Sequence, residues 1–251
     1  KSINDKFDEK ADAVYYLDGK KLKRVNKPCG DGTYVNVYIK TNPSVVDILN
    51  KDIVRKFIEI THERYKKECG KEFGKAMKGF FTDEPQYYRW ATAYSPVLIP
   101  YFKDKYDVDL WDEIGKLFVN CEGDYSFRYK YWNAMHRFFI DSFVKQIYDW
   151  CNENGCMLTG HAVEEANMYM QMWCCAGAME FYEYEHIPGI DWLGRNIYTE
   201  LEPKQLGSVA EQLGKKHTLT ETFACCGWDV TPQELKRIAE WQYVNGVNLM
   251  C

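Results

Sequence analysis

Two short segments of the sequence each combine an apolar run with a carboxylate at its end. The first is Lys78–Pro85, which contains Asp83 and Glu84, and the second is His217–Phe223, which contains Glu221. Each segment is typical of a buried strand that ends at an acidic residue. Catalytic groups of parallel α/β barrels lie where strands lead into loops, so these carboxylates are candidates for a matched acid and base.

Two carboxyl groups in opposite protonation states can cleave a glycosidic bond. One protonates the leaving oxygen, and the other attacks carbon or activates water. Glu84 suits the proton-donor role, because the apolar residues Phe80 and Phe81 would raise its pKa if it is buried. The competing interpretation of this segment is an acidic first turn of a helix. Glu221 suits the ionised role, and an unpaired carboxylate in an apolar strand is hard to explain structurally.

Further polar candidates follow another expected strand end. His161 closes the run Cys156–His161, and Glu164 and Glu165 come shortly after it. A neutral imidazole at this position can bind a sugar hydroxyl or orient Glu84, whereas the alternative is a histidine satisfied by the backbone. Glu164 and Glu165 are candidates for binding sugar hydroxyls, although either can also be the solvated start of a helix.

The run Tyr182–His186 alternates aromatic and acidic residues. If it is extended, Glu183 shares one face with Glu185, and Tyr182 lies on the other face. We therefore include Tyr182 and Glu183 among the candidate substrate-binding residues. An acidic face could also bind a divalent cation such as Ca²⁺. No Asp-x-Asp-x-Asp-Gly loop is present, so we expect no required cofactor and leave a metal site open.

Several aromatic residues fall in expected loops or at strand ends, where their faces could stack on sugar rings. Trp192 and Trp228 are the candidates assigned to substrate binding, and Trp228 is preferred because it follows Glu221 closely. Tyr87, Tyr88 and Trp90 belong to the same class. Core packing is the equal alternative for each of them, because large aromatic side chains also dominate cores.

The composition narrows the class of protein. The chain has 251 residues, 46% of them hydrophobic, and a formal net charge of -5. With a pI near 5.6, the charge argues against a nucleic acid or an anionic membrane as partner. No apolar run is long enough to span a membrane. The ten cysteines include no C-x-x-C pair, which favours free thiols and a cytoplasmic location, with secretion as the alternative if a signal peptide precedes Lys1.

The order of elements predicts two regions. Residues 1–40 contain short β-like runs around a turn at Asp18-Gly19, and we expect an antiparallel β insertion there. Residues 41–251 alternate helix and strand, with strands ending at Asp83, at His161, near Asp191, at Glu221 and at Cys251. If the last is the eighth strand of a (β/α)8 barrel, these are strands 4 to 8. We therefore expect a partial barrel from a longer multidomain protein.

The helices carry recognisable start and stop signals. Asn50 is expected to cap a helix whose apolar face includes Ile53, Phe57 and Ile60. Residues 125–154 carry apolar side chains at spacings of three and four, which predicts one long helix. Thr231 begins a capping box that ends at Glu234.

Several segments resemble the catalytic barrel of large bacterial glycoside hydrolases, nearest to the α-L-rhamnosidase-like group. They are Gly79–Pro85, Leu158–His161, His186–Asp191, Leu219–Phe223, Gly227-Trp228 and Trp241–Asn248. The resemblance covers most of residues 45–251. It implies a TIM-type barrel with catalytic carboxylates at the fourth and seventh strands, accompanied by other domains of the same chain. Many such barrels have Asn-Glu at the fourth strand, whereas here Asp83 precedes Glu84, so either residue is a candidate acid.

Three functions follow from these features. The leading one is a glycoside hydrolase acting on a carbohydrate, with Glu84 as proton donor and Glu221 as base or nucleophile. The second is a barrel that binds carbohydrate without cleaving it. The third is a metal-dependent lyase or isomerase in which His161, Glu183 and Glu221 are ligands.

Overall fold

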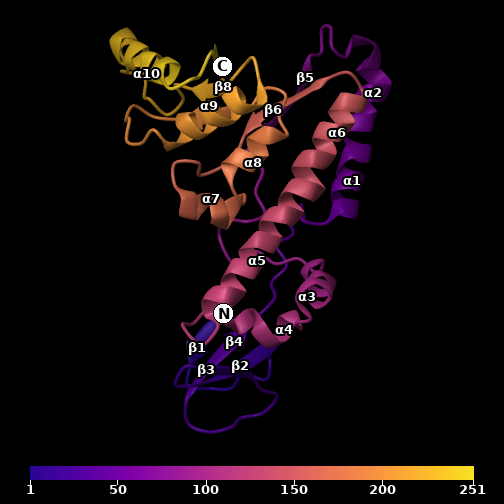
Figure 1. Cartoon of the computed structure of the whole chain (residues 1–251), viewed down its shortest axis with the longest axis vertical. Coiled ribbons are helices and arrows are strands. Elements are labelled where there is room, and N and C mark those ends of the chain that lie inside the picture. The colour runs from indigo at the N-terminus through magenta and orange to yellow at the C-terminus, as the bar shows by residue number, and fades with distance from the viewer. The chain divides into compact units, whose positions relative to one another are not determined.

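The computed structural model describes residues 1–251, which form two compact units (Figure 1). The first unit comprises Lys1–Val46 and Tyr94–Ala134, and the second comprises Asp47–Ala93 and Met135–Cys251. From the sequence we expected residues 41–251 to form one domain. In the structure, residues 94–134 instead group with the N-terminal segment.

The first unit is built on an antiparallel sheet with strand order β1-β4-β2-β3. Its strands are β1 (Ser2–Asn4), β2 (Ala13–Asp18), β3 (Lys21–Arg24) and β4 (Thr33–Val37), and its helices are α3 (Leu98–Tyr106), α4 (Leu110–Glu113) and the 3-10 turn Ile114–Leu117. Tyr15 of β2 is fully buried, and its hydroxyl donates to the carbonyl of Trp111. This contact joins the sheet to the helices within the unit.

The second unit holds five parallel strands in the order β5-β6 and β7-β8-β9. They are β5 (Gly79–Asp83), β6 (Met157–His161), β7 (Gly189–Trp192), β8 (Leu219–Thr222) and β9 (Leu249–Met250). A parallel bridge between Thr159 and Ile187 connects the two groups. The five strands lie where the sequence analysis predicted them. They form an α/β arrangement that does not close into a barrel.

The helices of the second unit alternate with these strands. They are α1 (Lys51–Ile60), α2 (His62–Cys69), the 3-10 turn Gly70–Glu72, α6 (Lys145–Glu153), α7 (Met168–Cys174), α8 (Ala178–Glu183), α9 (Leu201–Leu213) and α10 (Pro232–Val244). The predicted long helix is confirmed as a continuous run of α5 (Asp124–Phe139), a π-helical segment (Ile140–Val144) and α6. The boundary between the units falls within α5.

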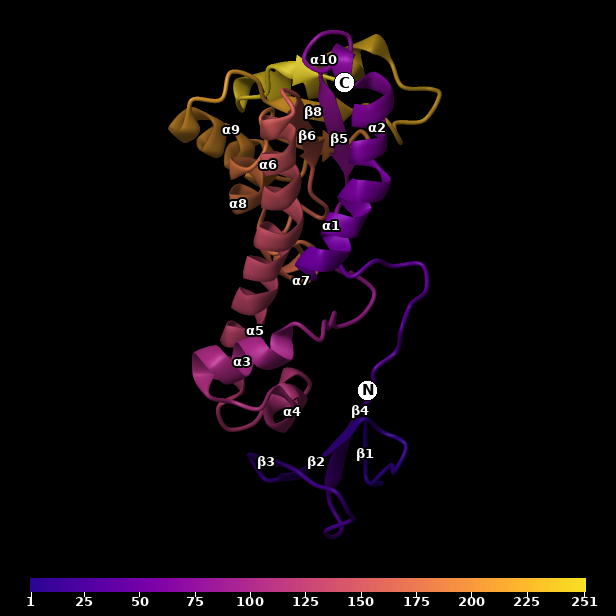
Figure 2. The same cartoon turned by 90° about the vertical axis from the view of Figure 1, so that its right-hand side faces the viewer.

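Helices α1 and α6 lie side by side against β5 and β6 (Figure 2). Val54 and Ile58 of α1 pack with Trp150 of α6 and Leu158 of β6. The predicted buried face of α1 is therefore wrong, because its other apolar stripe, Ile53, Phe57 and Ile60, is exposed. Two apolar stripes compete on this helix, and only packing selects between them.

Both predicted helix starts are confirmed. The Asn50 side chain accepts hydrogen bonds from the backbone amides of Asp52 and Ile53, and Thr231 and Glu234 form a reciprocal capping box. These bonds satisfy amides that have no partner inside a helix. None of the ten cysteines is paired, and no helix is both long and apolar enough to cross a membrane.

Candidate functional site

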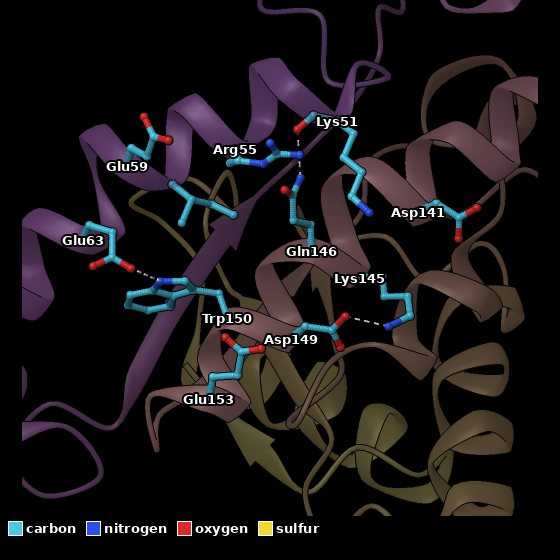
Figure 3. Close-up of a pocket in the computed structure, with 11 residues that line it drawn as sticks. Lys51, Arg55, Glu59, Glu63, Asp141, Lys145, Gln146, Asp149, Trp150 and Glu153 are labelled. Atoms are coloured by element: carbon cyan, nitrogen blue, oxygen red, sulfur yellow. Dashed lines mark hydrogen bonds and ion pairs between the residues drawn. The ribbon is translucent and has the colours of Figure 1, made fainter.

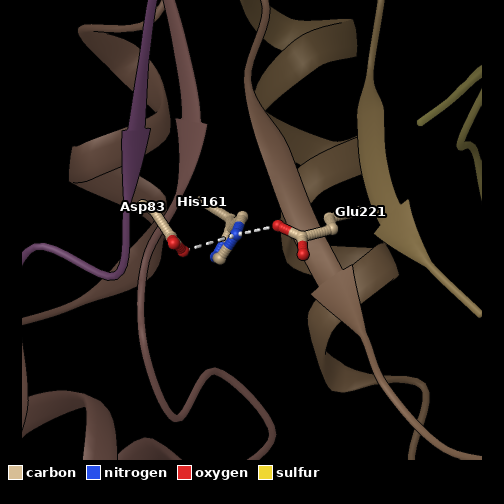
Figure 4. Close-up of side chains that lie close together, drawn as sticks. All are labelled: Asp83, His161 and Glu221. Carbon is tan, nitrogen blue, oxygen red and sulfur yellow. Dashed lines mark hydrogen bonds and ion pairs between the residues drawn. The ribbon is translucent and has the colours of Figure 1, made fainter. Parts of the chain in front are cut away.

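The register of the parallel strands brings four polar side chains to one edge of the second unit. Asp83 of β5 is paired with His161 of β6, and Asp191 of β7 is paired with Glu221 of β8. Paired positions on neighbouring strands present their side chains to the same face. Three of these side chains meet at the strand ends in Figure 4. The sequence paired Glu84 with Glu221 and offered Asp83 as the other candidate acid, and the contacts in the structure are those of Asp83 and Glu221 with His161.

His161 lies at the centre of this cluster. Its Nε2 atom is 2.9 Å from Oε2 of Glu221 and 3.2 Å from Oδ1 of Asp83, and its Nδ1 atom is 3.0 Å from the carbonyl oxygen of Ala162. Carboxylates and carbonyls only accept hydrogen bonds, so the geometry suits an imidazolium that donates from both nitrogens. Burial lowers the pKa of His161, but the Ala162 carbonyl and the carboxylates of Asp191 and Glu221 outweigh it and raise the pKa.

Glu84 follows directly after β5 in a left-handed backbone conformation, with φ of 45°. Burial raises the pKa of its carboxyl group, and the nearby Asp191 adds to the effect. Arg89 acts in the opposite direction, with its Nη1 atom 3.8 Å from Oε2 of Glu84. The net result is a carboxyl that keeps its proton to higher pH than an ordinary glutamate. A group of this kind can serve as a general acid.

Backbone strain is concentrated near this edge. Glu84, Glu164 and Phe223 all have positive φ angles, and they lie just after β5, β6 and β8 respectively. Non-glycine residues in this region are uncommon and cluster at functional sites. The strain supports the assignment of a site to the carboxyl ends of these strands.

Glu165 is a buried support of the cluster. Its Oε1 atom accepts hydrogen bonds from the Ala162 amide at 3.1 Å and from the Tyr182 hydroxyl at 2.7 Å. Burial raises the pKa of the Glu165 carboxyl well above the usual range, and the neighbouring Asp191 carboxylate contributes. The buried Glu165 carboxyl therefore keeps its proton to higher pH than an ordinary glutamate.

Two predictions for Tyr182–His186 are wrong. Tyr182 and Glu183 are the last two residues of helix α8, so this part of the segment is helical and not extended as expected. Tyr182 is fully buried, so it supports Glu165 and has no surface that a substrate could reach. Glu183 is exposed at the end of α8 and belongs to neither cluster of possible metal ligands.

The predicted aromatic residues separate into two groups. Trp192 is 2% exposed and packs with Cys226 and Ile238 in the core, so a substrate cannot contact its ring face. Trp228 is fully exposed after β8. Arg195 holds this loop, because its guanidinium donates to the Cys226 carbonyl and pairs with Asp229.

Sequence reasoning did not assign site roles to Asp191, Arg89 or Glu202. Asp191 was recognised only as a strand end, although its position after an apolar strand is the same signal that selected Glu221. Arg89 pairs with both Glu84 and Glu164. Glu202, in the first turn of α9, is buried and has its pKa raised to about 8 by burial and by Asp191. The sequence around Glu202 carries no signal for its burial.

Two sets of side chains could hold a metal ion. The first is Asp83, His161 and Glu221, and the second is His161, Glu165 and Asp191. In each set, the candidate ligand atoms lie within 4.8 Å of one another. Carboxylate oxygens with an imidazole nitrogen suit several divalent cations. The same atoms also suit proton transfer between carboxyl groups.

A separate groove of about 550 Å³ lies between α1 and α6 (Figure 3). Its lining mixes basic residues such as Arg55 and Lys145 with acidic residues such as Glu63 and Asp149. Several of these charges are already paired, as in the contact between Lys145 and Asp149. No residue that the sequence analysis assigned to the site lines this groove.

Comparison with known proteins yields a structural likeness. No family model and no curated protein sequence matches the chain. A rhamnosidase from Novosphingobium sp. PP1Y has a similar structure, with a TM-score of 0.63 and 19% sequence identity. The match covers 90% of this chain and 21% of that chain. At this identity the likeness shows a shared fold, and this chain spans a minor part of the length of that rhamnosidase.

Proposed function

We propose that the cluster hydrolyses a glycosidic bond, with α-L-rhamnosides as the substrate class. The observation that carries the proposal is the convergence of carboxylates from β5 and β8 on His161, with Nε2 2.9 Å from Glu221 and 3.2 Å from Asp83. The structural likeness to a rhamnosidase supports the choice of sugar. Paired carboxyl groups at strand ends are the usual machinery for this reaction.

In this mechanism Glu84 donates its proton to the oxygen of the leaving group. Its raised pKa supports that role, because an acid must hold its proton at the working pH. Glu221 either attacks the anomeric carbon, forming a glycosyl-enzyme that water hydrolyses as Glu84 takes up the proton of that water, or removes a proton from a water that attacks this carbon directly. His161 holds Glu221 in place through the 2.9 Å hydrogen bond. Both proton transfers use carboxyl groups, so the proposal requires no cofactor.

The fold proposal is that β5 to β9 correspond to strands 4 to 8 of a (β/α)8 barrel. Their parallel order and the alternation with helices support this correspondence. It places Asp83 and Glu84 at the fourth strand and Glu221 at the seventh. Other domains of a longer chain are the proposed partners of this region.

The test uses 4-nitrophenyl α-L-rhamnopyranoside as substrate. We expect hydrolysis by the unmodified protein and a loss of kcat of about a thousandfold in Glu221→Gln, because the variant keeps the shape of the side chain but cannot act as base or nucleophile. Glu211→Gln, on the exposed surface of α9, is the matched control and should keep full activity. Full activity in Glu221→Gln, with an unchanged melting temperature, would remove the assigned role.

A metal-dependent lyase or isomerase is the second candidate. The two sets of possible ligands around His161 favour it. Loss of activity in EDTA, followed by recovery on addition of Ca²⁺ or Mn²⁺, would support this candidate. Binding of rhamnosides without any turnover would instead favour a carbohydrate-binding protein.

A further inference from the structure

An aromatic platform lies beside the acid end of the cluster. We define it as Trp90, Tyr169 and Trp173, assembled around Arg89. The Arg89 guanidinium lies over the Trp90 ring at 4.9 Å, and the Trp173 indole donates to the Arg89 carbonyl at 3.0 Å. The rings of Tyr169 and Trp173 stack with an interplanar angle of 15°. One arginine therefore connects aromatic residues from the segments that follow β5 and β6.

Two residues of the platform are strongly exposed. Trp90 is 74% exposed and Tyr169 is 62% exposed. Met168, beside Tyr169, is also exposed. Grouped apolar exposure of this kind marks a binding surface, whereas single exposed apolar residues need no explanation. The stacking of Tyr169 on Trp173 limits its motion, so part of the surface is ordered before any ligand binds.

Arg89 also connects the platform to the proposed proton donor. Its Nη1 atom is 3.8 Å from Glu84 and 3.7 Å from Glu164. A general acid in glycoside hydrolysis contacts the oxygen that joins the sugar to its leaving group. Because Arg89 links the platform to Glu84, we expect the platform to lie on the side of the leaving group. The sugar that Glu221 attacks would lie on the other side of the bond.

We propose that the platform binds the leaving-group sugar of a disaccharide or longer rhamnoside. The proposal rests on the proposed function and adds a substrate preference to it. The C–H faces of a pyranose ring pack on aromatic rings, while its hydroxyl groups can accept from Arg89 and donate to Glu164. The combination of flat apolar faces with an adjacent ion pair suits this amphipathic ligand.

The experiment compares two substrates that carry the same sugar. α-L-Rhamnopyranosyl fluoride has no leaving-group sugar, whereas an α-L-rhamnosyl-glucose disaccharide has one. In Trp90→Ala and in Tyr169→Ala, we expect kcat/KM for the disaccharide to fall by about tenfold or more, because each substitution removes an aromatic ring that the bound sugar would cover. For the fluoride, kcat/KM should stay within about twofold, because that substrate does not reach the platform.

Tyr125→Ala is the matched control, since Tyr125 is also a strongly exposed aromatic residue, on α5. It should change kcat/KM for neither substrate. An equal loss for both substrates, or no loss for either, would overturn the proposal. If the unmodified protein hydrolyses neither substrate, the proposed function itself fails. In that case, the affinity of the disaccharide is compared between the unmodified protein and Trp90→Ala. Weaker binding to the variant would still support the platform as a sugar site. The same affinity for both proteins would reject it.

Discussion

At the scale of single residues, the charge of His161 decides how the cluster works. Its Nδ1 atom faces the Ala162 carbonyl, and its Nε2 atom faces two carboxylates. A protonated imidazole reduces the repulsion between Asp83 and Glu221, which would otherwise oppose their close approach. The histidine therefore permits two acidic residues to share one edge of the sheet.

We expect His161 to titrate above the ordinary histidine pKa of about 6.5. Its pKa is raised in the folded protein, so the stabilisation from its charge is fully present below about 6.5 and is lost as the pH rises through the folded value. The ring carbon resonances of His161 in an NMR titration would measure this pKa. The free energy of unfolding of the unmodified protein, measured relative to that of His161→Gln, should fall over the same pH range.

His186 provides an internal comparison in the same titration. Its Nδ1 atom accepts from the Leu158 amide at 2.9 Å, and its Nε2 atom donates to the side chain of Asn152 at 2.9 Å. Burial and the charge of Lys215 lower the pKa of His186, so it should titrate below His161. The reverse order would contradict the electrostatic description of the cluster.

At the scale of elements, close contact between β5 and β6 places Asp83 beside His161. A Cβ atom on Gly160 would lie 2.1 Å from the Thr82 carbonyl oxygen, far inside van der Waals contact. Glycine at this position is therefore required by the approach of the neighbouring strand. The residue after it, His161, depends on that approach for its contact with Asp83.

We expect Gly160→Ala to destabilise the fold by about 3 kcal/mol or more, because the strands must separate to admit the methyl group. Urea unfolding followed by circular dichroism would measure the change. Gly70→Ala is the control, since a Cβ atom there meets its nearest neighbour, Lys66, at an ordinary 3.5 Å. If both substitutions change the free energy of unfolding by the same amount, the β5–β6 contact has room for a methyl group at residue 160.

At the scale of the whole molecule, the second unit exposes apolar side chains and has strands that pair on one side only. β5 pairs with β6 and β9 pairs with β8, each on one side only. Phe81 on β5 is exposed, as are Ile53, Phe57 and Ile60 on α1. Unpaired strand edges and grouped apolar residues favour association between molecules.

The 251-residue chain should therefore self-associate at micromolar concentration in sedimentation velocity experiments. Combined substitution Phe57→Lys and Ile60→Lys should shift the distribution toward monomer, because two charges would have to be desolvated on contact. Tyr125→Lys adds a charge outside this surface and should have little effect. A monomer at every concentration would mean that these exposed groups do not associate.

Much of the local structure was predictable from the sequence. The five parallel strands, the helix over residues 125–154 and the caps at Asn50 and Thr231 all have local signals, because periodicity and capping depend on neighbours in the chain. The placement of Asp83 and Glu221 at strand ends followed from the same signals. Their meeting at one edge followed from the rule for parallel strands.

Tertiary structure alone decided which of several aromatic side chains of the same type stay accessible. Trp192 and Tyr182 are as suitable by type as Trp90 and Tyr169, yet packing buries the first pair and exposes the second. Likewise, α1 carries two apolar stripes, and contact with Trp150 buries only the one that contains Val54. The sequence by itself determined the elements and the acidic strand ends. Burial raises the pKa of Glu84 and Glu165, and the Ala162 carbonyl with the carboxylates of Asp191 and Glu221 raises the pKa of His161 against burial. Most of these contacts join residues far apart in the chain, which local patterns do not record.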